Sequence, residues 1–170
     1  FVVGGNHEGL NTEAYYNTFN SPTYYFEYGN ALFIVLNSML GQSVSYTDST
    51  QYHWMEDVLA KNTLPNVYVL NHVVTRDDYQ TDHNMTDAEA DTFEGILSGY
   101  KTAHPNYSVN VLFGHMHCLH SWQVGGVNYI VTGNGASKFY VSHEQGDILG
   151  TGTIAIKNGK ASFGFDPLLT

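Results

Sequence analysis

Short apolar runs that end in polar residues recur along the chain, and they predict β-strands. The clearest run covers residues 109–113 and leads into Gly114 and a group of histidines. It is too short for an ordinary helix and is rich in β-branched and aromatic residues, which favours a buried central strand. Residues 66–71 and 1–4 follow the same pattern. We therefore expect three strands whose ends deliver polar side chains to one place.

Helices and hairpins are predicted between these strands. Apolar residues recur at helical spacing from Asp48 to Lys61 and from Asp87 to Tyr100, and residues 13–19 suit a short helix. Residues 39–47 and 75–87 lack periodicity and are expected to be loops. Three hairpins are expected, formed by residues 24–28 with 31–37, 121–124 with 127–132, and 151–157 with 160–165 about Asn158-Gly159. The pattern as a whole predicts one α/β domain over residues 1–170.

Composition narrows the classes of function. The 170 residues are 42% hydrophobic, enough for a buried core. Six Lys+Arg against sixteen Asp+Glu give a formal charge of −10, which argues against a general nucleic-acid or anionic-membrane surface. Any phosphate chemistry must then draw its positive charge from metal. No apolar run is long enough to span a bilayer. The composition, with many Tyr, Asn, Thr and Ser and few Lys, resembles that of many secreted or cell-surface proteins.

Histidines at the expected strand ends suggest a metal site. If the chain is still extended there, His115 and His117 point to the same side, about 6–7 Å apart. Imidazoles so placed can ligate two metal ions separated by about 3.5–4 Å. Alternatively, the two histidines are solvated or bonded to backbone carbonyls, which is the usual outcome for an isolated H-x-H. The polar segment 6–8 and His72, at two further strand ends, make chance a weaker explanation.

Three motifs in order carry a resemblance to a known family. Gly5-Asn6-His7-Glu8, the strand-final His72 and Gly114-His115-Met116-His117 resemble the calcineurin-like metallophosphoesterases, which include the purple acid phosphatases. The resemblance extends from Val2 to about Val131. It implies an αββα sandwich of mixed sheets, in which a metal-activated hydroxide hydrolyses a small-molecule phosphoester.

The resemblance also implies a dinuclear metal site. Asn6, His72 and His115 would bind one ion, and His117 would bind the other. The two ions would be divalent or trivalent, and histidine with carboxamide and carboxylate ligands is compatible with Fe, Mn, Zn or Ni. No residues for a further cofactor are indicated.

Two catalytic residues follow from the same resemblance. His7 is similar to the family's catalytic histidine, which contacts the phosphate or helps to protonate the leaving oxygen. Glu8 would orient His7.

The sequence departs from the family pattern in two places. Val73-Val74-Thr75 follows His72, where the family commonly has a proline. The family's amino-terminal D-x-H and G-D-x-x-D/N motifs, which supply bridging carboxylates, are also missing. The sole Gly-Asp pair, Gly146-Asp147, is not followed by the required acid. We therefore expect the carboxy-terminal portion of a larger catalytic domain, with a missing amino-terminal segment that supplies Asp and His ligands.

Two other functions remain open. The first is a non-catalytic metal-binding or interaction domain, a degenerate or truncated relative; His7 speaks against it, because a structural site needs no general acid. The second is a mononuclear zinc hydrolase that uses Asn6, His72 and His115, although amide oxygen is an unusual zinc ligand.

Structural roles are expected for several other polar residues. Asp82 and His83 could bind an adventitious metal, but a solvated loop is expected for them, and an exposed helix surface for His53. Cys118, the only cysteine, excludes an intrachain disulfide. On an extended chain it would point away from His117, so it is expected to be a small buried residue and not a thiolate ligand.

Overall fold

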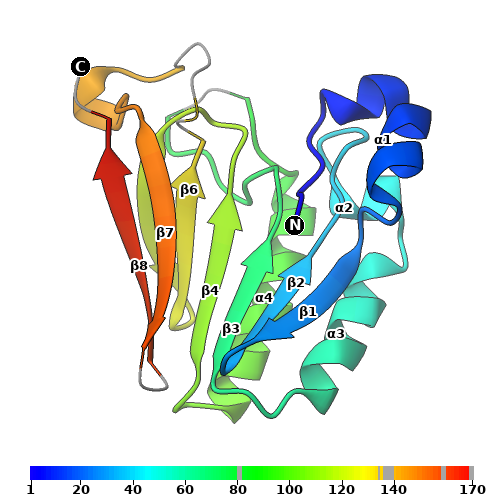
Figure 1. Ribbon diagram of the computed structural model, residues 1–170, viewed down its shortest axis with the longest axis vertical. Helices are drawn as coiled ribbons and strands as arrows, with labels where there is room; N and C mark the ends of the chain where they lie inside the picture. Colours follow the sequence, from blue (N-terminus) through cyan, green and yellow to red (C-terminus); the bar gives the residue numbers. More distant parts are fainter. Residues whose placement is uncertain (80–81, 134, 136–139, 158–159, 169–170) are drawn as a thin grey trace.

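The computed structural model describes residues 1–79, 82–133, 135, 140–157 and 160–168 (Figure 1). Its helices and strands alternate along much of the chain. In order they are η1 (Glu8–Asn11), α1 (Thr12–Phe19), β1 (Tyr24–Tyr28), β2 (Ala31–Val35), α2 (Val44–Thr47), α3 (Gln51–Lys61), β3 (Asn66–Leu70), α4 (Asp87–Ala103), β4 (Ser108–Phe113), β5 (Leu119–Val124), β6 (Val127–Thr132), η2 (His143–Gln145), β7 (Gly150–Lys157) and β8 (Lys160–Pro167).

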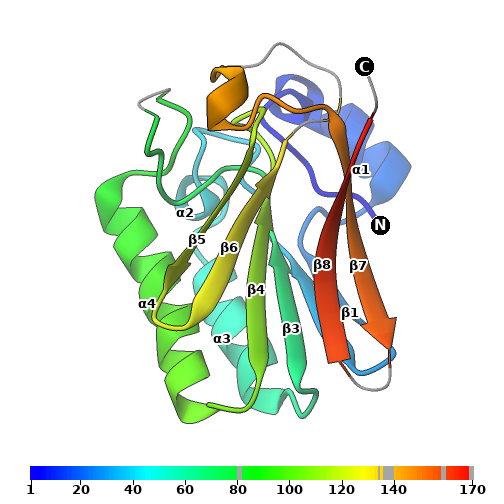
Figure 2. The ribbon, with the colours of Figure 1, turned by 90° about the vertical axis from the view of Figure 1, so that its left-hand side faces the viewer.

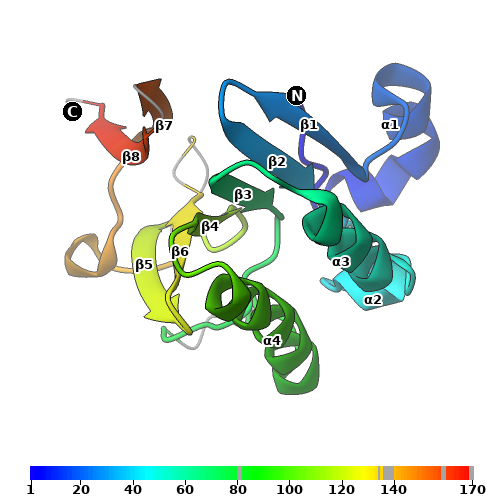
Figure 3. The same cartoon turned by 90° about the horizontal axis from the view of Figure 1, so that it is seen from below.

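A six-stranded mixed sheet forms the centre of the molecule. Its strand order is β1-β2-β3-β4-β6-β5, with β2, β3, β4 and β6 parallel and the two edge strands antiparallel to their neighbours. All five residues of β2 are buried, as the continuous apolar run of a central parallel strand predicts. The crossover helices α3 and α4 cover the same face of the sheet (Figure 3). The predicted α/β class is therefore confirmed.

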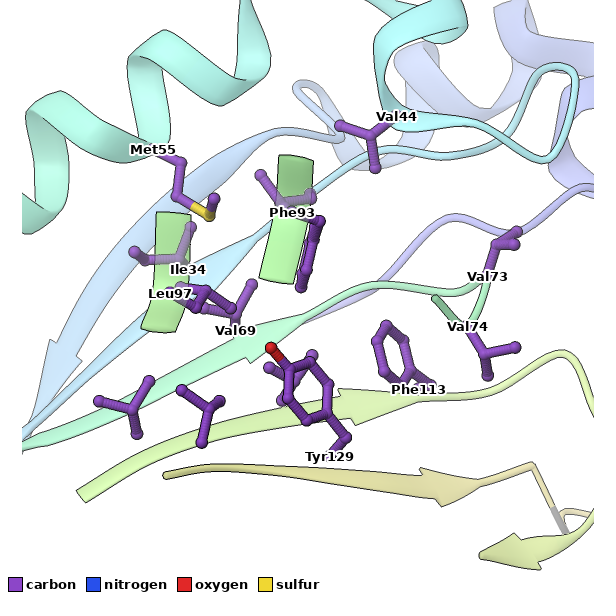
Figure 4. Packing of buried hydrophobic residues seen from close by; sticks show 14 of the residues in the cluster. Ile34, Val44, Met55, Val69, Val73, Val74, Phe93, Leu97, Phe113 and Tyr129 are labelled. Atoms are coloured by element: carbon purple, nitrogen blue, oxygen red, sulfur yellow. The ribbon is translucent and has the colours of Figure 1, made fainter. Parts of the chain in front are cut away.

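The main core lies between these helices and the sheet. Met55 of α3 and Phe93 and Leu97 of α4 pack toward Ile34 and Val69 on the sheet (Figure 4). The apolar residues of α3 and α4 recur at helical spacing, which places them on the buried face of each helix. This packing holds the parallel strands in register and so fixes the positions of their carboxyl ends.

The opposite face of the sheet carries the antiparallel pair β7–β8 (Figure 2). Ile154 and Ile156 of β7 pack against a second, smaller cluster formed by Ala31, Phe33 and Tyr68. Helices, a mixed sheet and a further β-layer thus follow one another through the molecule. The predicted turn at Asn158-Gly159 lies outside the described residues.

The prediction of a strand over residues 1–4 is wrong. This segment is irregular and has no ladder partner within the described part of the chain. The Tyr24 hydroxyl instead contacts both backbone groups of Val2, at 2.8 Å from its nitrogen and 2.9 Å from its oxygen. A side chain therefore satisfies backbone groups that a neighbouring strand would otherwise bind.

Smaller differences concern element boundaries. The expected loop over residues 39–47 contains α2, because the Ser43 side chain caps the Tyr46 N–H. Strand β2 ends at Val35, two residues before the expected end, and α4 continues three residues further to Ala103. Within the described residues, no helix has the length and apolar character that crossing a membrane would need.

Candidate metal centre

The carboxyl ends of β3 and β4 lie side by side and bring two histidines together. Leu70 pairs with Leu112, and two backbone bonds continue this ladder: Asn71 N to Leu112 O at 3.0 Å, and Gly114 N to His72 O at 3.1 Å. Because parallel strands end at the same edge of a sheet, the residues that follow them are neighbours there. His72 and His115 are therefore placed by the sheet itself.

Three side-chain donor atoms converge at this edge. His72 Nε2 lies 3.0 Å from Asn6 Oδ1 and 3.1 Å from His115 Nδ1. Two ligands that bind one ion at about 2.1 Å and at right angles lie about 3.0 Å apart. The spacing thus fits one metal ion, although Asn6 is delivered by an irregular segment and not by a strand.

Burial keeps both imidazoles neutral near neutral pH. It lowers the pKa of His72 to about 4 and the pKa of His115 to about 3. Neighbouring charges contribute to these shifts: Glu8 acts against the shift of His72, His72 and His83 add to the shift of His115, and His117 and His7 add to both. Because a metal-binding histidine must be unprotonated, these environments suit ligands.

Glycines make room for the His72 ring. A Cβ on Gly5 would lie 2.8–2.9 Å from three atoms of that ring, and a Cβ on Gly114 would lie 3.2 Å from His72 Nδ1. The ring therefore lies directly against the backbone at Gly5. Close packing against the His72 ring thus explains two glycines of the sequence motifs.

The histidines that follow β4 are not extended, contrary to expectation. His115 and His117 have φ angles of 59° and 48°, in the left-handed region, and the buried Met116 lies between them. The chain turns tightly where the β4 ladder ends, with Met116 N 2.7 Å from Gly114 O. Such conformations cost about 1–3 kcal/mol for residues other than glycine and cluster at functional sites.

The remaining residues of the resemblance lie around this centre. His117 is partly buried, and its ring stacks on Tyr140 with ring centroids 4.6 Å apart. His7 is exposed and precedes η1. Glu8 Oε2 accepts a hydrogen bond of 2.8 Å from Gly5 N and so shapes the turn that carries Asn6 and His7.

Comparison with known proteins supports the fold. No model of a protein family matches the sequence, and no curated protein does so either. The chain is similar to the solved structure of the purple acid phosphatase PPD1, isolated from seeds of yellow lupin (Lupinus luteus). The TM-score is 0.62 at 14% identity, and the alignment covers 87% of this chain and 30% of that chain. The chain has a metallophosphoesterase-like fold.

Within this metallophosphoesterase-like fold, one further histidine reaches the centre. The His83 ring centroid lies 5.0 Å from that of His115 and 4.1 Å from that of Tyr140. Among the described residues, His83 Nδ1 is buried and has no hydrogen-bond partner. The expected solvated position holds for the exposed Asp82 and is wrong for His83. The only sequence signal was a long loop directly after His72, since long loops in compact domains are often functional.

Gln42 is a second residue that sequence patterns did not indicate. Its Oε1 lies 3.1 Å from His115 Nε2, on the opposite side of the ring from His72. Gln42 also borders an open groove of about 660 Å³ between the loop before α2 and the start of α4. Asn84 and Glu89 line the same groove.

The described residues do not show a complete metal site. Among them, no three or more His, Cys, Asp or Glu side chains form a group that could hold an ion. The third donor beside His72 and His115 is the amide oxygen of Asn6. Cys118 is fully buried, and burial raises the pKa of its thiol to about 11, so the expectation of a small buried residue is confirmed.

Proposed function

We propose that this chain forms part of a metal-dependent phosphoester hydrolase. The observation that carries the proposal is the convergence of Asn6 Oδ1, His72 Nε2 and His115 Nδ1 at the carboxyl edge of the parallel strands. Ligands bind at this edge in open α/β sheets. The metallophosphoesterase-like fold supports the same chemistry.

In this proposal, Asn6, His72 and His115 hold one ion and His117 contributes to a second. When bound, the two ions would supply a nucleophile at neutral pH and offset the charge on the phosphoryl oxygens. Fe, Mn, Zn and Ni all suit such ligands. The chain's charge of −10 gives these ions a clear role, because cationic side chains are scarce.

His7 would assist the leaving group, supported by Glu8. Its exposed side chain is free to meet a substrate, and it is near enough to His72 and His115 to lower the pKa of both. Glu8 acts on the turn through Gly5 N. The groove beside Gln42 would accept the organic part of a small phosphoester.

Completion of the site requires carboxylates from elsewhere. The proposed set gives three ligands to one ion and one to the other. Two-metal hydrolases clamp the reacting phosphoryl group between two ions about 3.5–4 Å apart, which needs a fuller coordination of both. We therefore propose that an amino-terminal segment beyond these 170 residues supplies the remaining Asp and His ligands.

A non-catalytic metal-binding domain is the alternative. It is supported by the same convergence of Asn6 Oδ1, His72 Nε2 and His115 Nδ1, which involves donors for one ion only. Under this alternative, an ion would bind to Asn6, His72 and His115 without phosphoester hydrolysis.

Metal content and activity test the two functions. We would measure metals by elemental analysis, the intact mass of the sample, and hydrolysis of p-nitrophenyl phosphate and its bis ester. The variant His72→Ala should lose metal and at least 100-fold in activity. His53→Ala is the matched control, because that side chain is 90% exposed and contacts Glu56 instead of the convergent donors.

The outcomes separate the proposals. About two ions per molecule, together with mass beyond these 170 residues and activity, would support the hydrolase. Bound metal without hydrolysis of either ester would support the alternative. An equal loss in both variants, or no effect of His72→Ala on metal content, would contradict the assignment of His72.

A further inference from the structure

Gln42 contacts Nε2 of His115, the ring nitrogen that points away from Asn6 and His72. Its Oε1 lies 3.1 Å from His115 Nε2, while His115 Nδ1 lies 3.1 Å from His72 Nε2. The His115 side chain is buried, with 6% of the residue exposed. Both ring nitrogens therefore have a defined partner.

The backbone around Gln42 is shaped to present this side chain. Gln42 has a φ of 53° and follows Gly41 with a φ of 61°, so two successive residues are left-handed. A non-glycine residue keeps such a conformation only where its surroundings enforce it. Here the Thr47 hydroxyl of α2 contacts Leu40 N at 3.1 Å and Ser43 O at 2.7 Å, which closes the loop on both sides of Gln42.

The contact selects one form of the neutral imidazole. An amide oxygen accepts hydrogen bonds and cannot donate them, so the contact requires a proton on His115 Nε2. Neutral imidazole carries a single ring proton, and its Nδ1 therefore keeps a lone pair directed at the point where Asn6 and His72 converge. Hydrogen bonds to the second ring nitrogen orient metal-binding histidines in this manner.

We propose that Gln42 is a positioning residue that holds His115 in the Nε2–H tautomer and aims His115 Nδ1 at the metal. The claim about metal rests on the proposed function. The claim about the tautomer does not, because it can be measured without metal.

Two substitutions at Gln42 and one elsewhere test the proposal. Gln42→Glu keeps an acceptor oxygen at the same reach, whereas Gln42→Leu removes it. Gln123→Leu is the matched control, since Gln123 is exposed on β5 and bonds Asn128 instead. If Gln42→Leu fails to fold, the wild type and Gln42→Glu still decide the question.

The first readout is the ¹⁵N spectrum of the His115 ring in chelator-treated protein. Wild type, Gln42→Glu and Gln123→Leu should all show the Nε2–H tautomer. In Gln42→Leu, the Nδ1–H population should rise at least several-fold. A proton on Nδ1 in the wild type or in Gln42→Glu, or an unchanged tautomer in Gln42→Leu, would overturn the proposal.

The second readout is calorimetric titration of the same proteins with Mn²⁺ or Zn²⁺. Gln42→Leu should weaken binding by about 10- to 100-fold, and Gln42→Glu should restore it. Equal affinity of wild type and Gln42→Leu would overturn the positioning role. A wild type that shows the expected tautomer yet binds no ion, when tested as the complete protein, would instead overturn the proposed function.

Discussion

Gly5 shows how a single residue type controls the proposed centre. The His72 ring lies against its backbone, and Asn6 and His115 both contact Nε2 of that ring. A methyl group on Gly5 would lie 2.8 Å from the ring, closer than atoms can pack. The ring cannot retreat without breaking its contacts with the other two donors.

Gly5→Ala should therefore displace His72. We expect a loss of about 1–3 kcal/mol in unfolding free energy in urea, typical of overpacking, and weaker metal binding. Gly95→Ala is the control with the opposite sign: nothing lies within 4 Å of a Cβ there, so alanine should stabilise α4 by about 0.5–1 kcal/mol. Wild-type metal affinity in Gly5→Ala would refute the close-packing argument.

At the scale of elements, Arg76 joins the segment after β3 to helix α4. Its guanidinium contacts Glu94 at 3.0 Å and Asp91 at 2.6 Å. The Glu94 side chain is 7% exposed and the Asp91 side chain 74%. A buried carboxylate depends on its partner far more than an exposed one does, because water solvates the exposed charge.

We expect unequal effects from the two sides of this cluster. Arg76→Met leaves Glu94 buried and unpaired, and it should lower the unfolding free energy by about 3–5 kcal/mol. Asp91→Asn should cost less than about 1 kcal/mol. Urea unfolding followed by circular dichroism measures both. Similar losses of unfolding free energy in the two variants would contradict the claim that the buried Glu94 is the main partner of Arg76.

At the scale of the whole molecule, buried neutral histidines couple folding to pH. The folded-state pKa values of His72 and His115 are about 4 and about 3, below the ordinary value of 6.5. As the pH falls below 6.5, the unfolded chain binds protons that the folded chain does not. The contribution of these two histidines to the unfolding free energy is therefore fully present above pH 6.5 and is lost as the pH falls toward 3–4.

Urea unfolding of the metal-free protein should reveal this decline. Each histidine contributes about 1.4 kcal/mol per pKa unit between its folded and unfolded values. His72→Gln should make the slope of stability against pH shallower, since one titrating group is gone. Gln123→Leu should leave the slope unchanged, because the exposed Gln123 carries no titratable group. A stability that is flat from pH 6.5 to 4 would show that the rings are not buried as described.

The local pattern of the sequence determined most elements of the fold. The runs at 66–70 and 109–113 became β3 and β4 because continuous apolar strands need burial on both faces. Gly125 and Gly126 became the turn between β5 and β6, with φ angles of 56° and 77° that suit glycine. Residues 1–4 share the apolar pattern yet form no strand, because a strand also needs a neighbour with free backbone groups.

Sequence order also placed His72 and His115 at the ends of adjacent strands, which is the part of the centre that local patterns can predict. The tertiary structure decided the rest. Left-handed turns set the directions of His115 and His117, a long loop returned His83 to the centre, and a distant loop brought Gln42 against His115. The contacts of His83 and Gln42 with His115 join residues that are 32 and 73 positions apart in the sequence. Local periodicity cannot predict such contacts, because they depend on how the packed helices and strands position the loops between them.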